Sequence, residues 1–242
     1  MKVIVFDNAQ SAAQYAYNQF EQALKDGATT FGLATGSTPE PLYQLLRESD
    51  LDFTQATSIN LDEYYGLSAD HPQSYAYYMN EQLFHAKPFA HHYLPDGTNT
   101  DPLQETARYD QLIEDNPIDL QILGIGQNAH IGFNEPGTSF NSKTSLVDLT
   151  ESTIQANQRF FERMEDVPKQ AYSMGIQSIM SAKKIILLAF GENKAQAIYD
   201  TVEGPVSEAV PASILQNHPD CYILLDEAAA SQLNSENYER VN

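Results

Sequence analysis

The sequence predicts an α/β fold built on a mainly parallel sheet, because short apolar runs alternate with stretches of helical spacing. The runs expected to be strands are Val3–Phe6, Thr30–Ala34, Thr57–Leu61, Leu120–Gly124, Ile185–Phe190 and Tyr222–Leu225. The stretches expected to be helices are Ala9–Lys25, Glu40–Arg47, Tyr75–Phe84, Leu103–Glu114, Ala171–Ser181 and Lys194–Val202. Strands joined through helices of this length form right-handed parallel crossovers. The run Ile185–Leu188 has no polar alternation, so helices should cover both faces of the sheet.

Length and composition narrow the class of protein. The chain has 242 residues, of which 42% are hydrophobic, and this is enough apolar mass for a sizeable core. We expect a single domain over residues 1–242, since no internal repeat or low-complexity linker divides the sequence. The 33 acidic residues outnumber the 13 basic ones and give a net charge of −20. This charge disfavours nucleic acid and anionic membranes as partners.

Cysteine content and hydropathy bear on the cellular compartment. Cys221 is the single cysteine, so an internal disulfide framework and a cysteine-based zinc site are ruled out. The first apolar run is too short for a signal peptide, and no later stretch reaches the about 18 apolar residues of a membrane span. We expect a soluble, cytoplasmic protein.

Polar residues follow the predicted strands, and in an open parallel sheet ligands bind beyond the carboxyl ends of the strands. The first such segment is Leu33–Glu40, which runs from a strand into a helix. Gly36 permits a tight turn, and the Ser37 and Thr38 hydroxyls with free backbone N–H groups would form an anion cradle. The alternative is an ordinary Ser/Thr helix cap. The segment matches neither a Walker A loop nor a dinucleotide-binding motif.

Two carboxylates, Asp62 and Glu63, directly follow the third predicted strand. A carboxylate beside an apolar and aromatic wall can serve as a general base, because such surroundings raise its pKa toward the working pH. The alternative is a solvated acidic turn.

A third segment, Leu123–Gly137, places His130 and Glu135 after a strand that ends in glycines. Histidine is the side chain best suited to proton transfer near neutral pH. A structural, hydrogen-bonding histidine is the alternative, and the neighbouring glycines and the Asn-Glu-Pro turn favour catalysis. The longest stretch without clear periodicity, Gln127–Thr153, includes this segment and is expected to be a functional loop.

Two basic residues, Arg159 and Lys194, complete the candidate site. Most lysines and arginines are solvated surface groups, which is the alternative here. Because the chain has only 13 basic residues, those near strand ends are the best candidates for binding an anionic substrate.

Together these segments resemble the glucosamine-6-phosphate deaminase family. The resemblance covers nearly the whole chain and rests on Ala34–Pro39, Asn60–Gly66, Gly124–Gly137, Asn157–Phe161 and Gly191–Ala195, of which the segment around the histidine is the most specific. It implies a modified Rossmann-type domain that converts D-glucosamine 6-phosphate to D-fructose 6-phosphate and ammonia, in amino-sugar catabolism. It also implies that no metal or organic cofactor takes part.

The resemblance further implies a role for each candidate residue. Asp62 would remove the C2 proton and return it at C1 through an enolamine. His130 would move the proton that opens the pyranose ring, with support from Glu135 and Asn128. The residues implied to hold the phosphate are Gly36, Ser37, Thr38, Arg159 and Lys194.

The chain departs from the family pattern at Asn128, where many members carry an aspartate. An amide oxygen can accept the imidazole N–H of His130 and fix its orientation, but it cannot stabilise imidazolium by charge. We expect activity to persist, because the other proposed catalytic positions match.

Two other functions remain as alternatives. One is 6-phosphogluconolactonase, which shares the fold, and the other is a non-catalytic sugar-phosphate sensor domain of a transcriptional regulator. Asp62 and the Asn-Glu-Pro turn favour the deaminase. The acidic net charge and the lack of a basic DNA-binding segment argue against the sensor function.

The resemblance also bears on regulation. Larger family members form hexamers and bind N-acetylglucosamine 6-phosphate through basic residues shortly after the Asn-Glu-Pro turn. By register from Glu135, the corresponding positions here are Ser145 and Val147, and the single nearby cation is Lys143. Because neither position can pair with a phosphate, we expect hyperbolic kinetics and a monomer or small homo-oligomer.

Overall fold

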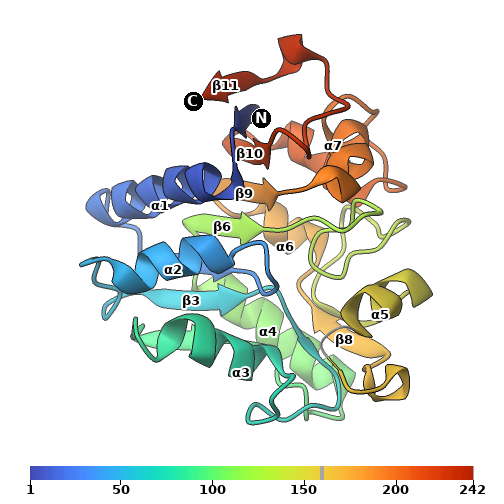
Figure 1. The fold of residues 1–242 in the computed structure, drawn as a ribbon. Coiled ribbons are helices and arrows are strands. Elements are labelled where there is room, and N and C mark those ends of the chain that lie inside the picture. The colour runs from blue at the N-terminus through green and yellow to red at the C-terminus, as the bar shows by residue number, and fades with distance from the viewer. Residues whose placement is uncertain (159–160, 242) are drawn as a thin grey trace.

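A computed structural model describes residues 1–158 and 161–241 of the chain. Its centre is an eight-stranded sheet, in which the paired neighbours are parallel. The strands are β1 (Lys2–Phe6), β2 (Thr30–Leu33), β3 (Thr57–Asn60), β5 (His91–Tyr93), β6 (Leu120–Leu123), β9 (Lys184–Ala189), β10 (Cys221–Asp226) and β11 (Glu239–Val241). They lie in the order β11-β1-β10-β9-β6-β2-β3-β5 (Figure 1). The predicted α/β fold with a mainly parallel sheet is confirmed.

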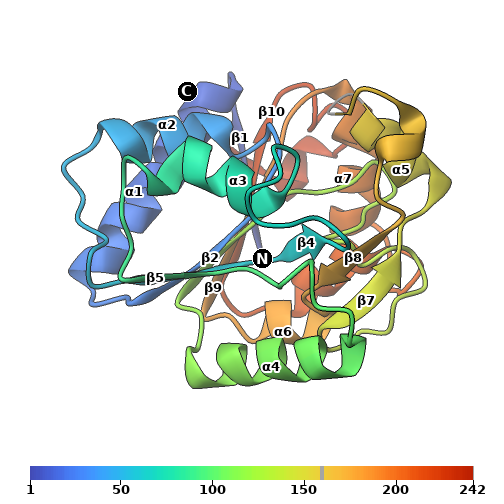
Figure 2. The ribbon, with the colours of Figure 1, turned by 90° about the horizontal axis from the view of Figure 1, so that it is seen from below.

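A second, antiparallel sheet lies beyond the carboxyl ends of the central strands, and its three strands are labelled next to one another in Figure 2. It consists of β4 (Asp62–Tyr64), β8 (Gln170–Ser173) and β7 (Ser145–Asp148), in the order β4-β8-β7. Only Leu61 separates β3 from β4, so the chain passes directly from the core of the large sheet into the small one. The small sheet thereby places Asp62 opposite Ser173.

Helices cover both faces of the large sheet, as the apolar strands predict. Figure 2 shows the first three helices on one face and α4 and α6 on the other. The helices are α1 (Ala9–Lys25), α2 (Glu40–Glu48), α3 (Tyr75–Met79), α4 (Pro102–Asp115), α5 (Glu151–Asn157), α6 (Ile176–Met180) and α7 (Ala195–Val202). A π-helical turn, Asn80–Phe84, continues α3, and short 3-10 turns span Met164–Asp166, Glu192–Lys194, Pro211–Asn217 and Ser235–Asn237. Among the described residues, no helix is long and apolar enough to cross a membrane.

The main core lies between the large sheet and its helices. Phe20 of α1 stacks on Phe31 of β2 with ring centroids 5.1 Å apart, and both rings are fully buried. A smaller hydrophobic cluster forms separately around Tyr64, Phe133 and Leu149, next to the small sheet. This second cluster supplies an aromatic wall for the site described below.

The structure corrects two sequence-based predictions and adds two edge strands that the sequence did not predict. The predicted helix Ala171–Ser181 is instead strand β8 followed by the short α6, because Ala171 and its neighbours pair with both β4 and β7. The predicted loop Gln127–Thr153 contains β7 and the start of α5. The edge strands β5 and β11 have only three residues each, too few for an apolar pattern to reveal them.

Candidate functional site

A cavity of about 890 Å³ opens at the carboxyl ends of β9, β6, β2 and β3, which are consecutive in the large sheet. It lies where polar residues follow the predicted strands. The sequence-predicted residues that line it are Gly36, Ser37, Thr38, Asp62, Asn128, His130 and Lys194. Glu135 does not line the cavity but contacts His130, and Arg159 lies outside the described residues.

Asp62 is the buried carboxylate of this cavity. Its side chain is only 7% exposed and shares the cavity wall with Tyr64, Tyr75 and Phe133. Burial, together with the charge of the adjacent Glu63, raises the pKa of Asp62 to about 8. The sequence-based expectation of an aromatic wall and a raised pKa therefore agrees with the geometry.

Glu63, which follows Asp62, differs from it because backbone N–H groups bind its carboxylate. Its carboxylate accepts backbone N–H groups of Tyr64 at 2.8 Å, and of Tyr75 and Ala76 at 2.9 Å, the last two at the start of α3. Burial raises the pKa of Glu63, and these three hydrogen bonds oppose that rise. Glu63 thus fastens α3 to β4, and the two adjacent carboxylates are not equivalent.

His130 faces a carboxylate. Its Nδ1 lies 3.3 Å from Oε2 of Glu135, and the side chains are 20% and 12% exposed. A carboxylate can only accept a hydrogen bond here, so Nδ1 carries the proton of the neutral ring. Burial raises the pKa of Glu135, but the hydrogen bond and charge of His130, and the bonds from Thr153 and Asn128, outweigh burial and lower it to about 2.

Asn128 does not bind the imidazole ring, contrary to the sequence-based expectation. Its Nδ2 donates to Oε2 of Glu135 at 2.5 Å, and its Oδ1 accepts the backbone N–H of His130 at 3.3 Å. The side chain therefore orients the carboxylate and the loop. Because Glu135 lies against the ring, Glu135 supplies the negative charge that an asparagine cannot.

Sequence reasoning missed two threonines at the start of α5. Thr153 Oγ1 donates to Oε1 of Glu135 at 2.5 Å, and Thr150 Oγ1 lies 3.3 Å from the same oxygen. Thr150 is also the helix cap, which accepts the backbone N–H of Thr153. Both threonines fall in a predicted loop, and nothing local in the sequence points to a carboxylate fifteen or more residues earlier.

Two glycines lie close to the His130 and Asp62 side chains. A Cβ atom on Gly126 would lie 2.4–2.6 Å from three ring atoms of His130, so the imidazole packs directly on this residue. Gly132 has a φ of 58°, and a Cβ there would lie 3.7 Å from Asp62 Oδ2 and 3.2 Å from Ser173 Oγ. The histidine loop consequently passes close to Asp62.

The segment after β2 also lines the cavity and has the geometry of a tight turn. Gly36 adopts a φ of 97°, which favours glycine, and its carbonyl accepts the Tyr78 hydroxyl at 2.7 Å. The N-cap of α2 is Pro39, and no side chain caps this helix. Ser37 and Thr38 therefore do not act as the helix cap that the sequence left as an alternative.

Lys194 occupies the N-cap position of α7. A positive charge at a helix N-terminus interacts unfavourably with the helix dipole, so Lys194 does not stabilise α7 at this position. Its Nζ donates to the carbonyl of Ile125 at 2.6 Å, which places the ammonium group at the loop that follows β6. Lys194 is thus the lysine of the cavity wall.

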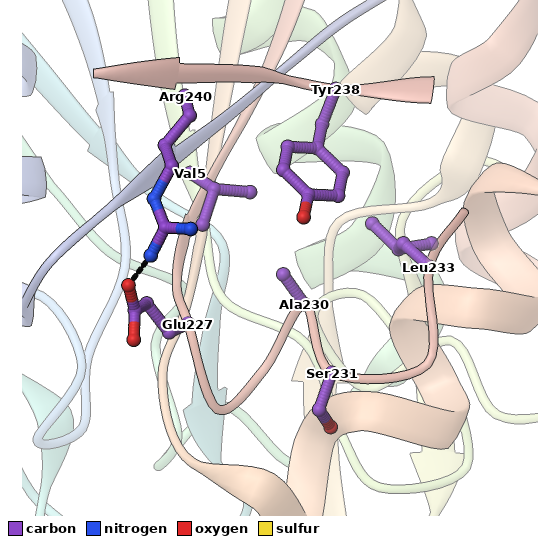
Figure 3. A pocket seen from close by; sticks show the side chains of 7 residues that line it. All are labelled: Val5, Glu227, Ala230, Ser231, Leu233, Tyr238 and Arg240. Atoms are coloured by element: carbon purple, nitrogen blue, oxygen red, sulfur yellow. Dashed lines mark ion pairs between the residues drawn. The ribbon is translucent and has the colours of Figure 1, made fainter. Parts of the chain in front are cut away.

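A smaller hollow of about 210 Å³ lies elsewhere, against β1 and β11 (Figure 3). An ion pair between Glu227 and Arg240 borders it. It shares no lining residue with the larger cavity.

In the part of the chain that the structure describes, no group of three or more His, Cys, Asp or Glu side chains is placed to hold a metal ion.

A family model for glucosamine-6-phosphate isomerases and 6-phosphogluconolactonases matches residues 6–223. The chain belongs to this family. Among family relatives, a glucosamine-6-phosphate deaminase of Oenococcus oeni is 58% identical over 234 residues, covering 97% of this chain and 99% of the relative. A solved monomeric glucosamine-6-phosphate deaminase is 44% identical with a TM-score of 0.93, covering 96% of this chain and 99% of that one.

The lactonase branch of the family is more distant. A 6-phosphogluconolactonase from Leishmania guyanensis is 19% identical with a TM-score of 0.77, covering 97% of this chain and 99% of that one. At this identity the likeness shows the fold alone. The family resemblance expected from the sequence is confirmed.

Proposed function

We propose that this protein is a glucosamine-6-phosphate deaminase, which converts D-glucosamine 6-phosphate and water to D-fructose 6-phosphate and ammonia. The observation that carries the proposal is that one cavity is lined by both a buried carboxylate of raised pKa, Asp62, and a histidine oriented by a carboxylate, His130. The names of relatives 55–58% identical to this chain support it.

The reaction needs an open sugar chain, because only the open form has a carbonyl at C1. Opening the pyranose ring moves a proton from the anomeric hydroxyl to the ring oxygen. In our proposal His130 performs this transfer through Nε2, since Nδ1 faces Glu135. Asn128 acts by holding Glu135. A positioned acid or base of this kind typically contributes roughly 10²–10⁴-fold in rate.

Asp62 is the proposed base for the next step. The C1 carbonyl acidifies the C2 proton, which passes to the Asp62 carboxylate while the C1 oxygen takes up a proton from the substrate's own C2 ammonium group, and a 1,2-enolamine results. Return of this proton to C1 gives the C2 imine, and water then displaces ammonia to form the ketone. A base with a pKa near the working pH accepts and releases the same proton readily.

The phosphate end is proposed to bind the turn after β2 and the lysine of α7. Gly36, Ser37, Thr38 and Lys194 line the same cavity as Asp62. Backbone N–H groups, hydroxyls and an ammonium group are the donors that phosphate oxygens require. Arg159 is proposed to add a second charge. Binding at this end orients C1 and C2 toward the acid–base groups.

The test is an assay of the purified protein on two sugar phosphates. We expect ammonia release from D-glucosamine 6-phosphate and no comparable hydrolysis of 6-phosphogluconolactone. The reverse preference would identify a lactonase, and binding without turnover of either compound would identify a sensor.

We also propose a monomer or small homo-oligomer, which a monomeric relative 44% identical to this chain supports. The cytoplasmic location stays a prediction.

A further inference from the structure

The carboxylate of Glu135 is held from both sides. Oε2 accepts from Asn128 at 2.5 Å and faces the ring of His130 at 3.3 Å, while Oε1 accepts from Thr153 at 2.5 Å. The first two partners belong to the histidine loop, but Thr153 belongs to α5, eighteen residues along the chain from Glu135. The carboxylate oxygen that does not face His130, Oε1, is therefore held by a residue of a separate element, α5.

The threonines form a short chain of hydroxyl groups. Thr150 Oγ1 donates to Thr153 Oγ1 at 3.0 Å, and the Thr153 hydroxyl donates a hydrogen bond to Glu135 Oε1. Thr153 is only 5% exposed, so water does not compete freely for that carboxylate oxygen. A hydroxyl donor in a buried position strengthens the ionised form of its acceptor.

We infer that Thr153 is a positioning residue for the ring-opening step, because it holds the Glu135 carboxylate in the orientation that directs His130. Without Thr153, Oε1 keeps only the longer 3.3 Å contact with Thr150, so the carboxylate can rotate about its terminal bond and the imidazole loses a fixed partner for Nδ1. Asp62 has no part in this arrangement. The inference rests on the proposed deaminase function, and it extends the site to a residue of α5.

The test compares Thr153→Val, which keeps the shape and removes the donor, with Thr153→Ser, which keeps the donor. The two substrates are D-glucosamine 6-phosphate and its analogue lacking the 4- and 5-hydroxyls, which can close neither a pyranose nor a furanose ring. For Thr153→Val we expect kcat on the cyclic substrate to fall about 10- to 100-fold with little change in KM. Turnover of the open analogue should change little, and Thr153→Ser should restore most of the loss.

Thr150→Ala is the control, because it removes the cap of α5 and the longer 3.3 Å contact to Glu135 Oε1 but leaves the 2.5 Å bond from the Thr153 hydroxyl in place. Its loss should be clearly smaller than that of Thr153→Val. An equal loss in both variants would show that α5 merely needs its cap. An equal loss of Thr153→Val on both substrates, or no loss at all, would likewise overturn the inference.

An activity-independent measurement separates this inference from the proposed function. The ¹⁵N spectrum of the histidine rings reports the hydrogen bond at His130 Nδ1. We expect this signal to move in Thr153→Val and to stay in place in Thr153→Ser. If the wild-type protein releases no ammonia while the signal moves, the deaminase function fails and the positioning role stands. An unmoved signal in Thr153→Val contradicts that role.

Discussion

Replacing Asp62 by asparagine should stabilise the fold increasingly as the pH rises. In the folded chain the pKa of Asp62 lies at about 8, against an ordinary value of 3.8. A raised pKa means that the folded state binds the proton more tightly, so its contribution to stability is complete below pH 3.8. That contribution is lost as the pH rises toward about 8.

The magnitude follows from linkage. Between the two pKa values the folded state binds one proton more than the unfolded state at Asp62, so stability falls by about 1.4 kcal/mol per pH unit. Asparagine has nearly the same shape and does not titrate. The difference in unfolding free energy between Asp62→Asn and the wild type should therefore grow by about 2.5 kcal/mol between about pH 5.5 and 7.5. Glu63 is present in both proteins, so its own titration largely cancels.

Urea unfolding at several pH values measures this difference by linear extrapolation. Asp119→Asn is the matched control, because burial raises the pKa of Asp119 but bonds from Lys183, Thr29 and Thr30 outweigh it and lower the pKa. That carboxylate is ionised in both states above pH 5.5, so its variant should show a constant difference. A constant difference for Asp62→Asn as well would refute the raised pKa.

Four further predictions concern activity. Because Asp62 must be ionised to accept a proton, kcat/KM should rise about tenfold per pH unit below pH 8 and then level off, which a pH–rate profile checks. Gly126→Ala should lower kcat by at least about tenfold, because the added methyl group displaces the His130 ring; a kcat like that of the wild type would contradict the packing. Lys194→Ala should raise KM roughly 10- to 150-fold, whereas Lys143→Ala, which removes an exposed partner of Glu114, should leave KM unchanged. Curves of rate against substrate concentration should be hyperbolic with or without N-acetylglucosamine 6-phosphate. A sigmoidal curve that this effector makes hyperbolic would contradict the prediction.

The sequence predicts the part of the molecule that local patterns encode. The run Ile185–Leu188 has no polar alternation, and β9 is buried on both faces. Asp62 and His130 follow apolar strands, and parallel strands deliver their carboxyl ends to one edge, so their shared cavity was predictable. Helices Ala9–Lys25 and Glu40–Arg47 differ from the observed bounds by at most one residue.

Long-range pairing decides the rest. Residues Ala171–Ser173 have a local pattern that suits a helix, and their pairing with β7 and with β4, the latter over a hundred residues away, makes them a strand. Thr153 falls at the end of the stretch predicted as a loop, and its bond to Glu135 depends on how two separate elements meet. Asn128 precedes the histidine closely in sequence, yet its amide reaches the carboxylate and the backbone.

The central claim is that Asp62 moves the C2 proton of glucosamine 6-phosphate. Proton NMR of that substrate in deuterated water, with the wild-type protein and with Asp62→Asn, tests it directly. With the wild type we expect loss of the C2 signal together with formation of fructose 6-phosphate and ammonia. With Asp62→Asn we expect the C2 signal to persist and no product to form, while substrate binding, followed by calorimetry, is retained. Turnover by Asp62→Asn at a rate near that of the wild type would contradict the account.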